Sequence, residues 1–194
     1  MGIYQLIMNR RTIRRFQQQP IAIEILTSLV NAGRVAPSGA NLQPLEFIIV
    51  DKTDLVEQVF TTLKWAGYIS PAGNPPDGKR PMAYIIVLIN TDIRKEKGEV
   101  DAAAAIENMI LAALEKGVGS CWIGSIDRKE IRKIFKLPEN YKVDSILALG
   151  YPDESPVIEE TENSIKYWKD ASGRLHVPKR KLENVLHVNE LEKK

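Results

Sequence analysis

The sequence predicts a single α+β domain, and two observations lead to this prediction. The 194 residues with 44% hydrophobic composition suit one globular domain, residues 1–194, with a substantial core. Stretches with helical apolar spacing alternate with short apolar runs typical of buried strands. The connections between them are unequal in length, which does not fit a regular series of βαβ units. We therefore expect helices packed on a sheet without a repeating βαβ architecture.

Helices and one strand account for the first third of the chain. Residues 2–8 carry apolar side chains on one helical face and predict a short helix. A second helix is predicted from Ile23, and Pro37 helps to end it. The apolar run 45–51 predicts a buried strand. A helix over 53–63 follows, and we expect the acid-rich DKTD sequence to cap it.

The middle of the chain carries the strongest strand and the most apolar helix. Residues 66–81 hold four prolines and three glycines, which predicts a loop. The run 83–90 is the clearest strand in the sequence. The stretch 99–117 is apolar nearly all round, so we expect a helix that lies inside the molecule. Three further elements are predicted: a short strand at 120–123, a helix at 127–136 and a strand at 145–152.

The last part of the chain, residues 153–194, is polar and only weakly periodic. Trp168, Leu182, Val185 and Leu186 nonetheless need cover from water. We therefore expect this C-terminal extension to wrap over another surface, such as a second subunit.

Charge and cysteine content narrow the class of protein. The net charge is +2, from 27 basic and 25 acidic residues, which does not suggest a general nucleic-acid or membrane binder. A single cysteine, Cys121, excludes an internal disulfide and fits a reducing compartment. The N-terminal charges follow the apolar stretch, the reverse of a secretory signal, and no run of 18 apolar residues exists. We expect a cytoplasmic protein.

Several kinds of catalytic site are excluded by the residues present. His176, His187 and Cys121 are too few for a closed zinc site. No H-E-x-x-H, P-loop or nucleophile-elbow pattern occurs, and GVGSCWIG lacks the G-x-G-x-x-G spacing. Cys121 has no histidine near it in sequence, so we expect a small buried hydrophobe and not a nucleophile. These absences from the sequence favour chemistry on a bound organic cofactor.

The sequence NRRTIRRF places Arg10, Arg11, Arg14 and Arg15 within six positions. If this stretch is helical, Arg10 and Arg14 share one face, and Arg11 and Arg15 share the next. Guanidinium groups present planar forks of donors that fit phosphate oxygens, so the cluster suits a dianionic group. The alternative is an ordinary solvated basic face.

Three other segments could bind a ligand. APSGANLQP, residues 36–44, offers backbone donors, a hydroxyl and an amide, although the same residue types dominate helix-to-strand turns. GVGSCWIGS, residues 117–125, offers an aromatic ring and a backbone that a planar ligand could approach, or is simply a glycine-bounded core strand. PKRK, residues 178–181, is a second basic cluster or a solvated tail.

Taken in order, these segments resemble the FMN-dependent nitroreductase family. RRTIRRF, PSGANLQP, GSCWIG after a buried helix, LGYP and a basic tail element follow one another as in that family. The similarity covers nearly the whole chain and is strongest in the first 50 residues and at 117–152. The resemblance implies an α+β fold whose central, mainly antiparallel sheet is flanked by helices. It also implies an interlocked homodimer that holds one FMN in each of two interface sites.

The resemblance assigns the ribityl phosphate of FMN to the two basic segments. The family's Arg-x-Ser/Thr element at the front of the chain matches Arg10, Arg11, Thr12 and Arg14. A basic residue near the C-terminus would complete the clamp, and it matches Lys179 or Lys181, with Arg180 between them.

The resemblance assigns the flavin ring to two further segments. The family's P-S-S-x-N-x-Q-P loop, which reaches the flavin from the other subunit, matches Pro37, Ser38, Gly39, Ala40, Asn41 and Gln43. Gly39 stands where a serine is common, which removes a hydroxyl and leaves the backbone. The family's strand end against the ring matches Trp122, Ile123, Gly124 and Ser125. There the backbone N–H of Gly124 would meet the flavin nitrogen that accepts hydride.

The implied activity is a ping-pong reaction on FMN. NADH or NADPH would reduce the flavin, and a nitroaromatic, a quinone or a similar electron-poor molecule would then be reduced in the same slot. Protein side chains would supply binding and electrostatic stabilisation. One alternative keeps the fold and changes the flavin chemistry to dehalogenation, flavin fragmentation or azoline oxidation. Another is a nucleic-acid-binding module without cofactor or catalysis.

Overall fold

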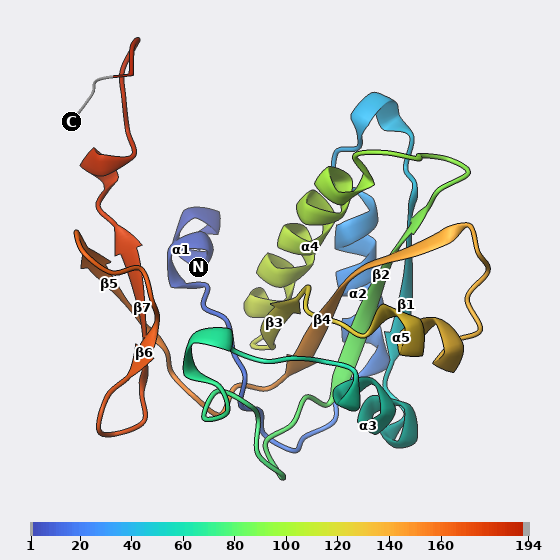
Figure 1. The fold of residues 1–194 in the computed structure, drawn as a ribbon, viewed down its shortest axis with the longest axis horizontal. Coiled ribbons are helices and arrows are strands. Elements are labelled where there is room, and N and C mark those ends of the chain that lie inside the picture. Colours follow the sequence, from blue (N-terminus) through green and yellow to red (C-terminus); the bar gives the residue numbers. More distant parts are fainter. Residues whose placement is uncertain (1, 192–194) are drawn as a thin grey trace.

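In the computed structural model, which describes residues 2–191, a four-stranded sheet forms the centre of the fold (Figure 1). The strand order is β1-β2-β4-β3, and every neighbouring pair is antiparallel. The predicted α+β fold with a mainly antiparallel central sheet is therefore confirmed. The strands are β1 (Leu45–Val50), β2 (Ala83–Asn90), β3 (Gly119–Ile123) and β4 (Tyr141–Gly150).

The strand β4 is longer than the sequence predicts. It begins at Tyr141 and not at position 145, because its first residues pair with the end of β2 beyond an irregularity between Val87 and Leu88. Tyr141 lies opposite Asn90 in this extension. A polar start such as YKVD lacks the apolar run by which a strand is recognised in sequence.

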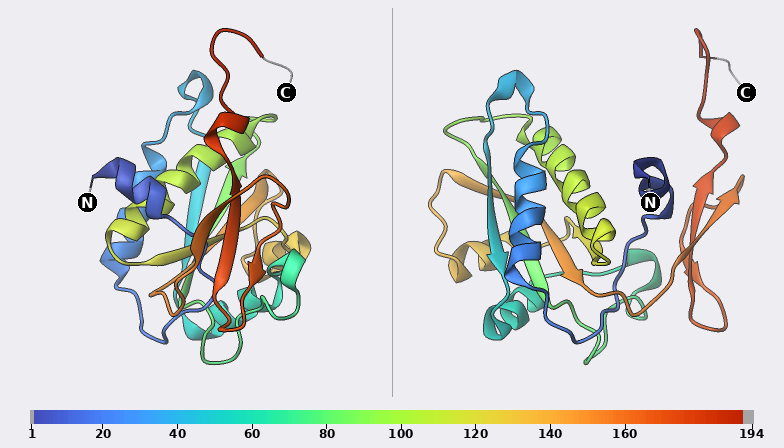
Figure 2. Two further views of the ribbon diagram at one scale, coloured as in Figure 1. Left: turned by 90° about the vertical axis from the view of Figure 1, so that its left-hand side faces the viewer. Right: turned by 180° about the vertical axis from the view of Figure 1, so that it is seen from behind.

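Helices cover both faces of the sheet (Figures 1 and 2). One face packs on α2 and α4, through residues such as Leu29 and Ile106. The other face packs on α3 and α5, through residues such as Val59 and Ile131. Central strand β2 supplies alternate side chains to both cores, and this explains why it is apolar throughout. The helices are α1 (Ile3–Asn9), α2 (Ile23–Arg34), α3 (Thr53–Thr61), α4 (Gly98–Glu115) and α5 (Arg128–Ile134).

Two expectations about the helices need correction. The predicted DKTD cap of α3 is wrong, because the cap position falls on Lys52, whose ammonium cannot accept a hydrogen bond from the helix. The helix α4 is buried along the side that faces the sheet and α2, but Val100 on it is 68% exposed. The expectation that α4 lies inside the molecule is therefore wrong in part, because only one side of the helix is buried and the other side is partly exposed to water. Among residues 2–191, no helix is both long and apolar enough to span a bilayer.

Residues 153–191, which we call the C-terminal arm, form a second small sheet beyond α1 (Figures 1 and 2). The sequence analysis predicted no strand here, because pairing between distant segments decides these strands and no apolar periodicity marks them. Met1 and residues 192–194 of the predicted domain lie outside the described residues. The strands, in the order β5-β7-β6, are β5 (Val157–Thr161), β6 (Trp168–Lys169) and β7 (Leu175–Arg180).

Apolar side chains at the end of the arm remain open to water. Leu182, Val185 and Leu186 are 69%, 51% and 55% exposed, and Trp168 is 44% exposed. Exposed apolar side chains that cluster on one segment are typical of a protein–protein interface. The expectation that this extension wraps a second subunit remains a prediction.

Candidate functional site

Residues 10–16, which we call the arginine segment, are extended and not helical. Helix α1 ends at Asn9, and Arg10 has φ −59° and ψ 127°. The N–H of Ile13 donates to the carbonyl of Ser120 over 2.9 Å, which pairs the segment with the free edge of β3. The helical condition under which two pairs of arginines would share successive faces is therefore not met, because the free edge of β3 supplies hydrogen bonds for an extended chain.

Two glycines explain how the arginine segment fits against the sheet. Gly119 and Gly150 lie opposite each other on β3 and β4. A Cβ atom on Gly119 would lie 2.9 Å from Ile13, and one on Gly150 would lie 2.6 Å from Phe16. The missing side chains thus leave room for Ile13 and Phe16, and Phe16 is fully buried there. The glycines of GVGS and LGYP therefore hold the arginine segment in place.

The guanidinium groups of this segment have few anionic partners. Arg10 lies 3.9 Å from Glu107, at the limit of an ion pair. Within residues 2–191, no ion pair joins Arg11, Arg14 or Arg15 to a carboxylate. Burial and the adjacent charge of Arg10 lower the pKa of Arg11. Crowded cations with so few counterions among residues 2–191 form an electropositive site suited to an anion with several charges.

Contacts with the C-terminal arm complete the surroundings of this segment. The Arg14 guanidinium lies 5.3 Å from the centre of the Tyr167 ring, and Glu154 accepts a hydrogen bond from the Arg14 N–H over 2.5 Å. Lys169 adds a further cation, and burial together with the charge of Arg15 lowers its pKa. The sequence analysis did not identify Tyr167, Glu154 or Lys169, because contacts between segments far apart in the sequence bring them here.

The basic residues expected near the phosphate lie elsewhere in this chain. Lys181 pairs with Glu162 at 2.5 Å, and Lys179 lies on β7 opposite Glu160. No hydrogen bond or ion pair in the described part of the chain joins either lysine to the arginine segment. Their predicted role in a phosphate clamp stays a prediction.

A cleft of about 270 Å³ lies beside the arginine segment. It is bounded by Arg10 and Arg11, by the C-terminal part of α4 and by the start of the arm at Glu154–Pro156. Gly119 and Ser120 of β3 form part of its wall. The arginine segment and strand β3 therefore border a concave site that could hold a small ligand.

The end of β3 presents an open backbone. Among the described residues, no atom lies within 4 Å of the position where Gly124 would carry a Cβ. Its carbonyl accepts a hydrogen bond from Arg128 over 3.1 Å, while its N–H has no partner within residues 2–191. Next to it Ile123 is buried and Trp122 is 43% exposed. A planar group could approach this backbone closely and accept a hydrogen bond from the free N–H.

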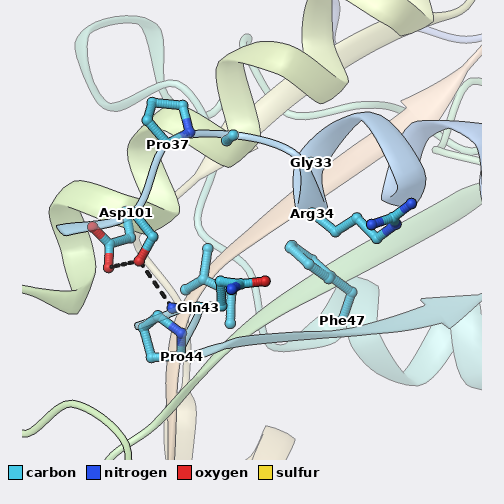
Figure 3. Close-up of a pocket in the computed structure, with 10 residues that line it drawn as sticks. Gly33, Arg34, Pro37, Gln43, Pro44, Phe47 and Asp101 are labelled. Atoms are coloured by element: carbon cyan, nitrogen blue, oxygen red, sulfur yellow. Dashed lines mark hydrogen bonds between the residues drawn. The ribbon is translucent and has the colours of Figure 1, made fainter. Parts of the chain in front are cut away.

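The PSGANLQP loop is strained and rests on a buried carboxylate (Figure 3). Three of its residues have left-handed backbones, with φ 52° at Ala40, 54° at Asn41 and 50° at Gln43. Ser38 Oγ donates to Asp101 over 3.0 Å and accepts the Gln43 N–H over 3.0 Å. The loop borders a cavity of about 160 Å³ that extends towards the end of α2. Strained residues of this kind gather at binding sites, where the surrounding structure enforces them.

Asp101 is the residue at this loop that sequence reasoning missed. Its side chain is 5% exposed and receives a further hydrogen bond from Arg94 over 2.8 Å. The available signal was an acid followed directly by five apolar residues, Ala102 to Ile106, because a carboxylate that becomes buried requires donors around it.

The PSGANLQP loop and the end of β3, which are both predicted to meet the flavin ring, lie at opposite ends of α4 (Figure 1). The loop rests on Asp101, near the N-terminus of the helix, whereas β3 follows its C-terminus. A helix of 18 residues is about 27 Å long. The structure therefore brings the arginine segment and the end of β3 together, and it keeps the PSGANLQP loop of the same chain away from them.

Cys121 lies in the core beneath the arginine segment. It is 4% exposed, and burial raises the pKa of its thiol to about 11. A thiol with so high a pKa stays protonated near neutral pH and is a poor nucleophile. This agrees with the expectation of a small buried hydrophobe.

Comparisons with known proteins agree with these features. The model of the Nitroreductase family matches residues 7–151. A proposed NADH dehydrogenase/NAD(P)H nitroreductase of Methanothermobacter thermautotrophicus is 30% identical over 162 residues, which are 80% of this chain and 80% of that protein. The iodotyrosine deiodinase of Thermotoga neapolitana is 26% identical over 180 residues, which are 85% of this chain and 97% of the deiodinase.

A solved structure extends the similarity to nearly the whole chain. An FMN-dependent nitroreductase from Clostridium difficile R20291 is 25% identical and superposes with a TM-score of 0.70. The match covers 96% of this chain and 98% of that one. It therefore includes most of the C-terminal arm as well as the central sheet.

Proposed function

Because the chain belongs to the nitroreductase family, we propose that it uses NADH or NADPH to reduce small electron-poor molecules on a bound FMN. The resemblance noted in the sequence is confirmed by the family match over residues 7–151. Oxidoreductase activity with FMN and NAD(P)H is supported by the names of the relatives from M. thermautotrophicus and C. difficile. Nitroaromatics and quinones are the acceptors that we propose.

The arrangement that carries this proposal is the arginine segment beside the open end of β3. Arg10, Arg11, Thr12 and Arg14 would hold the doubly charged phosphate of FMN. The guanidinium groups of the three arginines lack strong carboxylate partners in residues 2–191, and Thr12 would add a hydroxyl. The segment lies against β3 through the Thr12–Ser120 pair. The chemistry of this donor set therefore fits a flavin nucleotide.

The end of β3 would receive the flavin ring. Trp122, Ile123, Gly124 and Ser125 would lie against the ring. All but Ile123 are exposed, and the free N–H of Gly124 is available to a ring nitrogen. FMN, when bound, supplies the hydride chemistry of the reaction. The protein would orient the ring, neutralise the charge that it gains on reduction and exclude water. Binding of the nicotinamide and then of the acceptor in one slot would give ping-pong kinetics.

A homodimer would complete this site. Pro37, Ser38, Gly39, Ala40, Asn41 and Gln43 lie at the far end of α4 from β3 in the same chain. A second subunit could bring its own copy of this loop to the flavin. The exposed apolar side chains of the arm are consistent with such an interface, and we propose that residues 153–194 wrap the partner. Formation of the dimer would then bring Lys179 or Lys181 to the phosphate of FMN.

The test is flavin binding by the purified protein. We expect a yellow protein near twice 21.8 kDa whose visible absorbance bleaches on anaerobic addition of NADH or NADPH. The double variant Arg10→Ala/Arg14→Ala should lose FMN and remain a folded dimer. The variant Lys129→Ala/Lys133→Ala, which removes the same charge from the exposed face of α5, should keep FMN.

Full flavin occupancy in the arginine variant would overturn the assignment of the phosphate site. A colourless protein that takes up no added FMN and binds DNA or RNA in a salt-dependent manner would instead favour the nucleic-acid module.

Dehalogenation is the second candidate, because an iodotyrosine deiodinase is among the relatives. It would use the same flavin site with a different substrate. Anaerobic reaction of the reduced protein with a panel of nitroaromatics, quinones and 3-iodotyrosine would distinguish the two activities. Release of iodide without reduction of nitro compounds would favour the deiodinase.

A further inference from the structure

The carboxylate of Asp101 accepts three hydrogen bonds at one end of α4. Its donors are the hydroxyl of Ser38 at 3.0 Å, the N–H of Gly39 at 3.2 Å and the guanidinium of Arg94 at 2.8 Å. The Asp101 side chain is 5% exposed and that of Arg94 is 16% exposed. A charge this well buried requires its partners, because losing one leaves an uncompensated group in the interior.

Arg94 occupies the space next to Gly39 where a side chain would be. A Cβ atom on Gly39 would lie 2.6 Å from Nη1 and 2.9 Å from Nη2 of Arg94, closer than real Cβ contacts allow. The guanidinium is itself held, because its Nε donates to the carbonyl of Glu96 over 2.9 Å. The absence of a side chain at position 39 and the presence of Arg94 are therefore coupled.

The part of the PSGANLQP loop that follows Ser38, residues 39–43, is exposed to water. Within it, Ala40, Asn41 and Gln43 have left-handed backbones. Each such residue costs of the order of 1 kcal/mol relative to ordinary backbone. An exposed strained loop keeps one conformation only when its base is fixed, and here Asp101 fixes that base through Ser38 and Gly39.

We propose that Arg94 and Asp101 are positioning residues for flavin binding, which they support through the partner subunit's loop and without touching the cofactor. This inference rests on the proposed function. Asp101 holds Ser38 and Gly39, and Arg94 pairs with the carboxylate of Asp101 and fills the space at Gly39. The loop then reaches the flavin already in its binding conformation, so that less conformational entropy is lost when the cofactor binds.

The first experiment compares two acid-to-amide variants on the same helix. Asp101→Asn keeps the shape of the side chain but cannot accept all three hydrogen bonds. Glu99→Gln, the matched control, removes an exposed charge that pairs with Lys142. We expect the dissociation constant for FMN to rise about tenfold or more in Asp101→Asn. It should change less than about twofold in the control.

A spectroscopic signal separates positioning from a general loss of stability. At saturating FMN, Asp101→Asn should change the visible circular dichroism of the bound flavin, which reports the surroundings of the ring. A variant that is merely less stable would keep the wild-type spectrum once it is saturated and folded. An unchanged FMN affinity and spectrum in folded Asp101→Asn would overturn the inference.

A double-mutant cycle keeps the proposal testable if Asp101→Asn does not fold. Gly39→Ala alone should weaken FMN binding about fivefold or more, because its Cβ displaces Arg94. In the Arg94→Met background the same change should have less than about a twofold effect. Independent, additive effects would contradict the coupling of positions 39 and 94. A wild-type protein that binds no FMN would instead refute the proposed function itself.

Discussion

Replacing Gly150 by alanine would test whether the packing of Phe16 fixes the arginine segment. The added Cβ would lie 2.6 Å from Cδ1 and 2.8 Å from Cβ and Cγ of Phe16, whereas ordinary contact begins near 3.4 Å. The overlap is thus about 0.6–0.8 Å with three atoms of one side chain. Phe16 is fully buried, so its ring has no open space into which it could turn.

The expected loss of stability follows from this overlap. Overpacking of a filled core costs about 1–3 kcal/mol, and a collision with a ring that cannot move belongs to the upper part of this range. Alanine also restricts the unfolded chain, which offsets about 0.4–1 kcal/mol. We therefore expect Gly150→Ala to lower the free energy of unfolding by about 2 kcal/mol.

Urea unfolding followed by far-ultraviolet circular dichroism measures this change. Gly67→Ala is the matched control, because no atom in the part of the chain that the structure describes lies within 4 Å of its added Cβ. Shortening the side chain in Gly150→Ala/Phe16→Leu should restore part of the stability. FMN affinity should fall in Gly150→Ala, since the displaced segment carries the arginines. A free energy of unfolding within about 0.5 kcal/mol of wild type would refute the reasoning about this contact.

Two further predictions concern titratable groups. His176 lies between Asp170 at 3.2 Å and Glu159 at 3.1 Å and stacks on Trp168, and the hydrogen bond with Asp170 raises its pKa above the ordinary value near 6.5. The stability that protonated His176 gives the arm is therefore complete below about pH 6.5 and is lost as pH rises through the higher folded-state pKa. NMR titration should show this raised pKa, and His176→Gln should flatten the corresponding fall in Tm. Cys121, whose buried thiol has a pKa of about 11, should not react with a thiol reagent at pH 8 until the protein unfolds, and rapid labelling of the native protein would contradict its burial.

Local sequence was sufficient to locate the strands of the central sheet and its helices, apart from the start of β4. The run AYIIVLIN predicts β2 at 83–90, and the structure places the strand at the same residues. The apolar spacing from Ile23 predicts α2, which begins there. These elements follow from periodicity because each must turn one face, or in β2 both faces, to a core. The family resemblance was also carried by short local motifs.

Tertiary structure decided the features that depend on distant partners. The arginine segment is extended because it pairs with the edge of β3. The residues of RRTIRRF do not themselves indicate that a strand edge is available to them. The strands of the C-terminal arm form by pairing β5 with β7 across a long connection, which weak periodicity does not show. The role of Asp101 likewise required the contact with Ser38, 63 positions earlier in the chain.

The sequence by itself was enough to predict which residues would meet an anion and a planar ring, because these proposed roles depend on side-chain chemistry in short motifs. Only the tertiary structure showed that one chain separates these motifs along α4. A rigid helix of about 27 Å keeps the PSGANLQP loop from the arginine segment, whatever the motifs around them contain.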